Sequence, residues 1–236
     1  MSHHILRLEN VAYTYPDGCR ALEDISFTVG HGQHMAVVGA NGAGKSTLLL
    51  CMGGLLLPTS GTIAIGSTKI VRRTLSVIRR SVGLVFQNPD DQLFMPTVEE
   101  DVAFGPVNMG LPPDQIELRV EDALRRVGAE DLRRKAPYRL SGGQKKRVAI
   151  ASVLAMEPSV LVMDEPTAGL DPKARRQIME LVAEFEHTTV IATHDMQLAE
   201  ELCPRTIMML RGRLSADGPT EALLHDRGLL ELSELA

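Results

Sequence analysis

The residues from Gly39 to Thr47 have the types and spacing needed to bind phosphate groups. They match the pattern G-x-x-x-x-G-K-[ST] and follow directly on an apolar run, Met35 to Val38. Glycines let backbone N–H groups approach an anion, and the start of a following helix adds positive potential. Lys45 adds a full charge, and the Ser46 hydroxyl is a suitable ligand for Mg²⁺. The segment predicts a nucleoside triphosphate site. The residues expected to form it are Gly39, Ala40, Asn41, Gly42, Ala43, Gly44, Lys45, Ser46 and Thr47.

A second helix start built from small residues lies at Leu140-Ser141-Gly142-Gly143-Gln144. Small residues permit close approach, and the unpaired N–H groups of a helix start favour negative charge. An ordinary serine N-cap followed by a glycine turn would have the same sequence. These residues alone therefore leave both interpretations open.

Two adjacent carboxylates, Asp164 and Glu165, follow the apolar run Val160 to Met163. Asp164 at the end of a strand can hold Mg²⁺ through water. Glu165 is placed to orient or deprotonate an attacking water, which phosphoryl transfer requires. A plain surface turn is the alternative, and the phosphate-loop pattern earlier in the chain favours the catalytic interpretation.

The composition limits the kind of protein that carries these groups. The chain has 236 residues, 44% of them hydrophobic, enough to bury the core of one large domain or two small lobes. No apolar run approaches the roughly 20 residues that a membrane-spanning helix needs. Three scattered cysteines without C-x-x-C spacing disfavour a zinc site or a disulfide framework. A net charge of -5 argues against a nucleic-acid partner.

The pattern of apolar residues predicts an α/β fold. Residues 5–15, 25–29 and 61–65 are typical of strands in a small antiparallel sheet. The runs at 35–38, 160–163, 190–193 and 207–210 indicate buried strands of a mostly parallel sheet. Residues 97–155 are expected to be helical, with a capping box at Thr97 and Glu100, and a further helix is expected after Pro172.

Taken together, these motifs resemble the nucleotide-binding subunit of ATP-binding cassette transporters over nearly the whole chain. The resemblance implies a single cassette domain that binds ATP and Mg²⁺ and hydrolyses ATP. It divides the chain into a core (about 1–87 and 156–218), an inserted helical subdomain (about 88–155) and a short tail (219–236). In that family two subunits pair head to tail. The signature motif, here Leu140, Ser141, Gly142, Gly143 and Gln144, then completes the partner's phosphate site.

Four further positions match motifs of the same family. Gln87 resembles the Q-loop glutamine, which contacts Mg²⁺ and water, and Asp171 resembles the D-loop residue that crosses between subunits. His194 would bind the terminal phosphate and position Glu165 and the water. Tyr15 would stack on adenine, although a half-buried strand tyrosine would look the same and Tyr13 lies close by. The resemblance assigns catalysis to Glu165, His194 and Gln87 and metal binding to Ser46, Gln87 and Asp164.

The segments 86–94 and 97–106 resemble the energy-coupling-factor branch of importers. The resemblance implies a transmembrane coupling protein that docks near residues 86–106, a substrate-capture membrane component, and a peripheral position on the cytoplasmic face of the membrane. Its cargo is expected to be cobalt or nickel, with a vitamin such as biotin as the alternative. The short segment after the last strand favours a homodimer.

A cassette ATPase that acts on nucleic acid or ribosomes, outside transport, would share all of these motifs. Its usual marks are long coiled-coil insertions, zinc-binding cysteines or a second cassette, and the sequence shows none of them.

Overall fold

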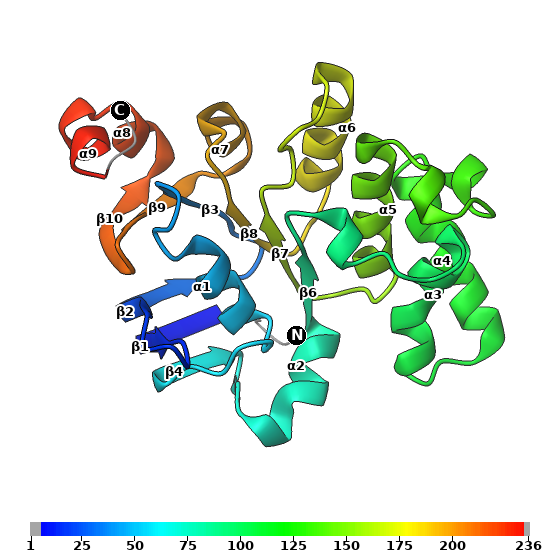
Figure 1. Ribbon diagram of the computed structural model, residues 1–236, viewed down its shortest axis with the longest axis horizontal. Helices are drawn as coiled ribbons and strands as arrows, with labels where there is room; N and C mark the ends of the chain where they lie inside the picture. The colour runs from blue at the N-terminus through cyan, green and yellow to red at the C-terminus, as the bar shows by residue number, and fades with distance from the viewer. Residues whose placement is uncertain (1–5, 234–236) are drawn as a thin grey trace. The chain divides into compact units, whose positions relative to one another are not determined.

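The computed structural model describes residues 6–233 (Figure 1). One sheet has four strands in the order β2-β1-β4-β5, all of its pairs antiparallel. Its strands are β1 (Leu6–Thr14), β2 (Arg20–Val29), β4 (Ser60–Ile65) and β5 (Thr68–Lys69). Ile5, the first residue of the expected strand 5–15, lies outside the described residues. The prediction of a small antiparallel sheet is confirmed.

The second sheet has six strands in the order β10-β9-β3-β8-β7-β6. β3 pairs in parallel with β8 and β9, and β7 pairs in parallel with β8, as the buried apolar runs predicted. β10 is antiparallel to β9 and closes one edge. The strands are β3 (His34–Gly39), β6 (Val82–Val85), β7 (Val160–Asp164), β8 (Thr188–Ala192), β9 (Arg205–Leu210) and β10 (Arg213–Pro219). The strands β6 and β10 were not expected from the sequence.

Helices follow most strands of the second sheet, and three of them make up most of residues 98–154. They are α1 (Lys45–Met52), α2 (Leu75–Ser81), α3 (Val98–Asn108), α4 (Pro113–Arg126), α5 (Gly142–Leu154), α6 (Pro172–Ala183), α7 (Met196–Leu202), α8 (Thr220–Leu224) and α9 (Arg227–Leu232). Thr97 caps α3, and the predicted capping box with Glu100 is present. Within residues 6–233, no helix combines the length and the apolar character that a membrane span would need.

The chain divides into two compact units. The first, here called the sheet unit, comprises residues up to Leu84, Ser159–Glu165 and the chain from Glu186 onward. The second, the helical unit, comprises Val85–Pro158 and Pro166–Phe185, so it includes α6 as well as α3, α4 and α5. The expected tail 219–236 contains α8 and α9, and its residues 234–236 lie outside the described part.

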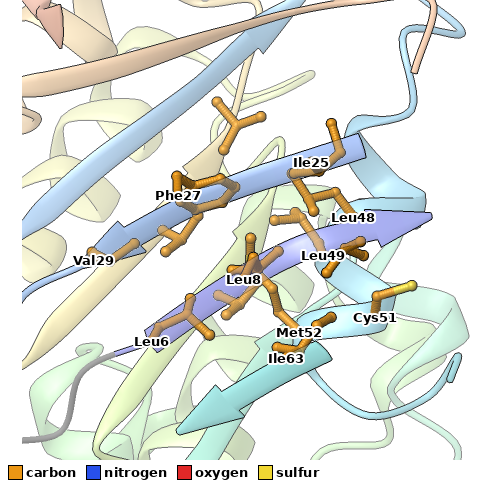
Figure 2. Close-up of a cluster of buried hydrophobic side chains, with 14 of the residues drawn as sticks. Leu6, Leu8, Ile25, Phe27, Val29, Leu48, Leu49, Cys51, Met52 and Ile63 are labelled. Carbon is orange, nitrogen blue, oxygen red and sulfur yellow. The ribbon is translucent and has the colours of Figure 1, made fainter. Parts of the chain in front are cut away.

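A core in the sheet unit joins the antiparallel sheet to α1 (Figure 2). Alternate residues of β1 and β2 point to the same face, so their apolar side chains meet those of α1. Full burial of each such leucine or methionine contributes about 2 kcal/mol. The core anchors the helix that begins directly after the phosphate loop. Its labelled members are Leu6, Leu8, Ile25, Phe27, Val29, Leu48, Leu49, Cys51, Met52 and Ile63.

Candidate nucleotide site

The phosphate-loop residues connect β3 to α1. Gly44 is the N-cap of α1 with φ 100°, and a Cβ there would lie 2.5 Å from the carbonyl oxygen of Ala21. Glycine is therefore required by conformation and by space. No side chain caps the start of α1. Its first N–H groups are thus left for another acceptor, which is what a phosphate supplies.

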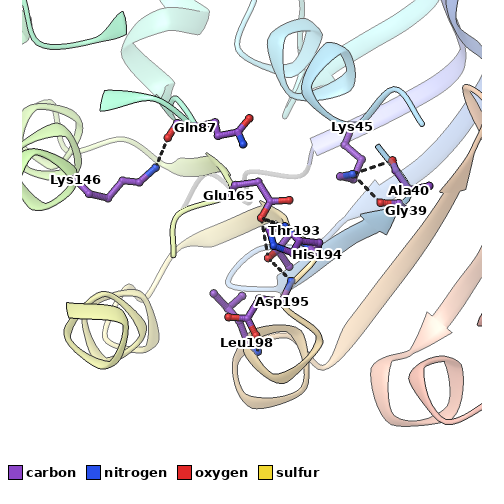
Figure 3. Close-up of polar contacts among 10 residues, drawn as sticks. All are labelled: Gly39, Ala40, Lys45, Gln87, Lys146, Glu165, Thr193, His194, Asp195 and Leu198. Carbon is purple, nitrogen blue, oxygen red and sulfur yellow. Dashed lines mark hydrogen bonds and ion pairs between the residues drawn. The ribbon is translucent and has the colours of Figure 1, made fainter. Parts of the chain in front are cut away.

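The Lys45 side chain lies across this loop and is 8% exposed. Its Nζ donates to the carbonyl oxygens of Gly39 at 2.7 Å and Ala40 at 3.1 Å (Figure 3). Among residues 6–233, no ion pair joins Lys45 to a carboxylate. A buried ammonium without a counter-charge favours an anion nearby. The loop therefore fits a phosphate, and the exposed Ser46 beside it fits Mg²⁺.

Tyr15 follows the end of β1, next to this loop. Its hydroxyl is 3.0 Å from the Thr47 Oγ1, so the ring is tied to the first turn of α1. Tyr13 packs edge-on against it, with ring centroids 4.9 Å apart and an interplanar angle of 87°. Tyr15, of the two, is the tyrosine that the hydrogen bond links directly to the phosphate-loop residues.

Parallel pairing brings the loop and the two carboxylates to one edge of the six-stranded sheet. The Thr193 N–H donates to the Val37 carbonyl at 3.0 Å, and the Glu165 N–H donates to the Ala192 carbonyl at 2.9 Å. The ladder thus continues one residue past the ends of β8 and β7. Ligands of α/β proteins bind at this carboxyl edge of parallel strands.

Glu165 is held in an unusual and well-defined position. It has a positive φ of 45°, is 6% exposed, and follows Asp164, which is 9% exposed. Its Oε2 lies 3.3 Å from the Thr193 Oγ1, 3.3 Å from the His194 N and 2.8 Å from the His194 Nδ1 (Figure 3). Few residues other than glycine adopt a positive φ, and this conformation at a buried carboxylate supports a functional role.

Thr193 is a site residue that the sequence analysis missed. It is fully buried, donates to Glu165, and its Oγ1 accepts the Asp195 N–H at 2.9 Å. The sequence places it only at the end of an apolar run. Its position directly before His194 was the available signal.

The remaining predicted residues belong to the helical unit. Ser141 caps α5, and a capping box with Gln144 has distances of 2.9 and 3.3 Å. Ser141 and Gly142 are exposed, so the N–H groups at this helix start are accessible to an anion. Gly143 is also needed for packing, because a Cβ there would lie 3.2 Å from the Ala174 Cβ of α6. The serine cap and an anion site are therefore compatible.

Asp171 and Gln87 also have clear local partners in this unit. The Asp171 carboxylate caps α6 by accepting the N–H groups of Lys173 and Ala174, both at 3.0 Å. The Gln87 carbonyl accepts a hydrogen bond from the Lys146 Nζ at 2.6 Å. The sheet unit thus brings together Tyr15, the phosphate loop, Asp164, Glu165 and His194. The helical unit holds Gln87, the 140–144 motif and Asp171.

The sequence of this chain is similar to those of known proteins. The family model described as ABC transporter matches residues 22–168. An ABC transporter ATP-binding protein of Geobacter sulfurreducens is 58% identical over 235 residues, covering 100% of this chain and 94% of the relative. The energy-coupling factor transporter ATP-binding protein EcfA1 of Methanospirillum hungatei is 46% identical over 231 residues, covering 96% and 83%.

Solved structures of proteins from the same family have a similar fold. The structure of cbiO1 from Clostridium perfringens, described as part of the ABC transporter complex cbiONQ, has a TM-score of 0.85 and 43% identity, covering 99% of this chain and 95% of that one. A dimeric structure of the cassette MJ0796 in a post-hydrolysis state, bound to ADP and phosphate, has a TM-score of 0.82 and 31% identity, covering 91% and 98%.

Proposed function

This chain belongs to the ABC transporter family, as the ATP-binding and ATP-hydrolysing subunit of an energy-coupling-factor type transporter, and we propose that it drives import of cobalt or nickel. It does so as half of a head-to-tail homodimer on the cytoplasmic face of the membrane. One observation supports the proposed catalytic mechanism. Thr193 and His194 both contact the Glu165 carboxylate, at the sheet edge that also bears the phosphate loop.

In this proposal each side chain has a defined task. Lys45 and the N–H groups that begin α1 bind the phosphates of ATP. Ser46, Gln87 and, through water, Asp164 would hold Mg²⁺, which would supply charge neutralisation for the phosphates. Glu165 orients the attacking water and accepts its proton. Contacts with the Thr193 hydroxyl and with the N–H and ring of His194 fix the direction of its carboxylate.

His194 connects the carboxylate to the phosphate side of the site. Its Nδ1 contacts Glu165 at 2.8 Å while the side chain remains 68% exposed. The exposed part of the ring is free of this contact, so His194 is placed to touch a phosphate while it holds Glu165.

Replacing Thr193 by valine is expected to lower kcat about 10- to 100-fold without weakening ATP binding. Valine keeps the shape but removes a hydrogen bond to a charged group, which contributes about 1.5–3 kcal/mol. Steady-state phosphate release and equilibrium ATP binding measure the two quantities. Thr189→Val is the matched control, since Thr189 is also buried and lies on β8, the strand that ends just before Thr193, with its Oγ1 3.5 Å from the His187 carbonyl. Equal kcat values for the two variants would exclude a role for Thr193.

An exposed aromatic pair supports docking of a membrane protein near residues 86–106. Phe94 and Phe104 are 63% and 44% exposed and pack edge-on with centroids 4.9 Å apart. The buried Asp101 carboxylate holds the loop in place, because its Oδ1 accepts the N–H groups of Phe94 and Met95, both at 3.0 Å. Two exposed aromatic side chains packed together are typical of an interaction surface. The proposed partner is the transmembrane coupling protein.

Replacing both phenylalanines by serine is expected to reduce recovery of the membrane components at least about tenfold, as buried aromatic anchors contribute about 2 kcal/mol or more each. Affinity purification of the tagged chain from detergent extracts measures the loss. ATPase activity of the isolated chain should stay unchanged. Leu118→Ser, at a residue 64% exposed on α4, is the control. Undiminished recovery with the double variant would place docking elsewhere.

The cargo is tested by uptake in cells that express this subunit with the membrane components. Labelled cobalt, nickel and biotin are compared between wild type and Glu165→Gln, which removes the energy source but not the complex. Metal uptake lost in the variant supports the proposal. Uptake of biotin alone assigns a vitamin cargo, and uptake of none of them by an assembled complex contradicts an importer of these substrates.

A further inference from the structure

The backbone that carries Gln87 is tied to α5 by a buried lysine. Lys146 is 2% exposed. Its Nζ donates to the carbonyl oxygens of Gln87 at 2.6 Å and Phe86 at 3.3 Å (Figure 3). Burial of a lysine is costly unless its ammonium is well bonded. These bonds therefore restrain the residues that follow β6.

Gln92 forms a second tie between the same segments. Its Oε1 accepts the Phe86 N–H at 3.2 Å, and its Nε2 donates to the Ala149 carbonyl at 2.6 Å and the Ser152 Oγ at 3.0 Å. One amide thus holds both the start of the 86–92 segment and the middle of α5. All of these residues belong to the helical unit.

A third contact, between Lys145 and Asp90 at 2.6 Å, lies nearer the surface. The Asp90 side chain is 60% exposed and that of Lys145 is 19% exposed. Exposed ion pairs contribute little, about 0–1 kcal/mol. Lys145 and Lys146 are neighbours of the same charge and length, so they form a natural control and test pair.

The helix that receives these ties begins at the signature motif. α5 starts at Gly142, capped by Ser141, and Lys146 lies about one turn later. A helix is rigid over that distance, so a displacement of the Gln87 backbone is passed directly to Ser141. We infer that Lys146 is a positioning residue that makes the Gln87 loop and the signature motif move as one body. The inference rests on the proposed function, in which Gln87 contacts Mg²⁺ and Ser141 contacts the ATP of the partner.

The test compares Lys146→Met with Lys145→Met in the purified full-length chain. Lys146→Met should speed amide hydrogen exchange at residues 86–92 at least about tenfold. It should also raise the Mg²⁺ concentration for half-maximal ATPase about tenfold, as loss of a residue that orients a metal ligand does. Nucleotide binding without Mg²⁺ should be unchanged. Lys145→Met should match wild type in all three measurements. Identical exchange and Mg²⁺ dependence in the two variants would overturn the inference.

If Lys146 only stabilised the fold, Lys146→Met would lower the unfolding temperature without changing the Mg²⁺ dependence. That result would also count against the inference. If Lys146→Met does not fold, Gln92→Met decides, because it cuts the second tie and leaves Lys146 in place. Gln92→Met should show smaller changes of the same kind in amide exchange and in Mg²⁺ dependence. Wild-type behaviour of this variant would refute the coupling of the Gln87 loop to the signature motif. None of these readouts needs a cargo, so failure of the metal-import proposal is recognised separately, in the uptake assay.

Discussion

Glu165→Gln is expected to lower kcat for ATP hydrolysis about 100- to 10,000-fold while leaving ATP binding intact. Glutamine has the same shape, and its amide oxygen can still accept from Thr193 and His194. It cannot take a proton from water. Because bound ATP is then not consumed, the variant should accumulate as an ATP-bound dimer. Phosphate release measures turnover, and sedimentation with and without ATP measures the dimer.

Asp164→Asn is the informative companion to this variant. Asp164 is proposed to act through Mg²⁺, so its loss should also raise the Mg²⁺ requirement, whereas Glu165→Gln should not. Unchanged turnover in Glu165→Gln would remove Glu165 from the role of base. A loss of ATP binding in that variant would show that the carboxylate maintains the nucleotide site instead.

Ser141→Arg is expected to abolish hydrolysis by the dimer and to spare ATP binding by the single subunit. Ser141 is exposed at the start of α5, so an arginine there meets the surface that faces the partner in the head-to-tail arrangement. The phosphate loop lies in the other unit and keeps all of its residues. Titration with a fluorescent ATP analogue and phosphate release measure binding and turnover.

The control for Ser141→Arg is Ser141→Ala. Both variants lose the N-cap, which costs about 1 kcal/mol of stability, but only arginine adds bulk and charge. The difference in turnover between them therefore reports the paired site and not the cap. Full activity of Ser141→Arg would contradict the head-to-tail model.

Local patterns in the sequence were enough for much of the fold. The buried runs at Met35–Val38 and Val160–Met163 predicted parallel strands because both faces of such strands are covered. Thr97 and Glu100 predicted the start of α3 because a capping box depends only on residues three apart.

The missed features depend on contacts between distant residues or on weak local signals. β6 has only four residues, Val82–Val85. β10 is an edge strand that ends in Gly218 and Pro219, residues that disfavour strands in sequence. Thr193 meets Glu165 only through the pairing of β7 with β8. The sequence around Lys146 is typical of a basic, exposed helix face, whereas in the structure Lys146 is buried against the carbonyl groups of residues 86 and 87.

In the proposed dimer, one subunit's phosphate loop works with the other subunit's signature motif. The most direct test mixes Lys45→Met, which lacks the phosphate-binding ammonium, with Ser141→Arg, each inactive alone. In a mixed dimer one site carries both lesions and the other carries neither. Head-to-tail pairing predicts recovery of about a quarter of wild-type turnover, since half of randomly formed pairs are mixed and each holds one intact site of two. A mixture no more active than its components would contradict it.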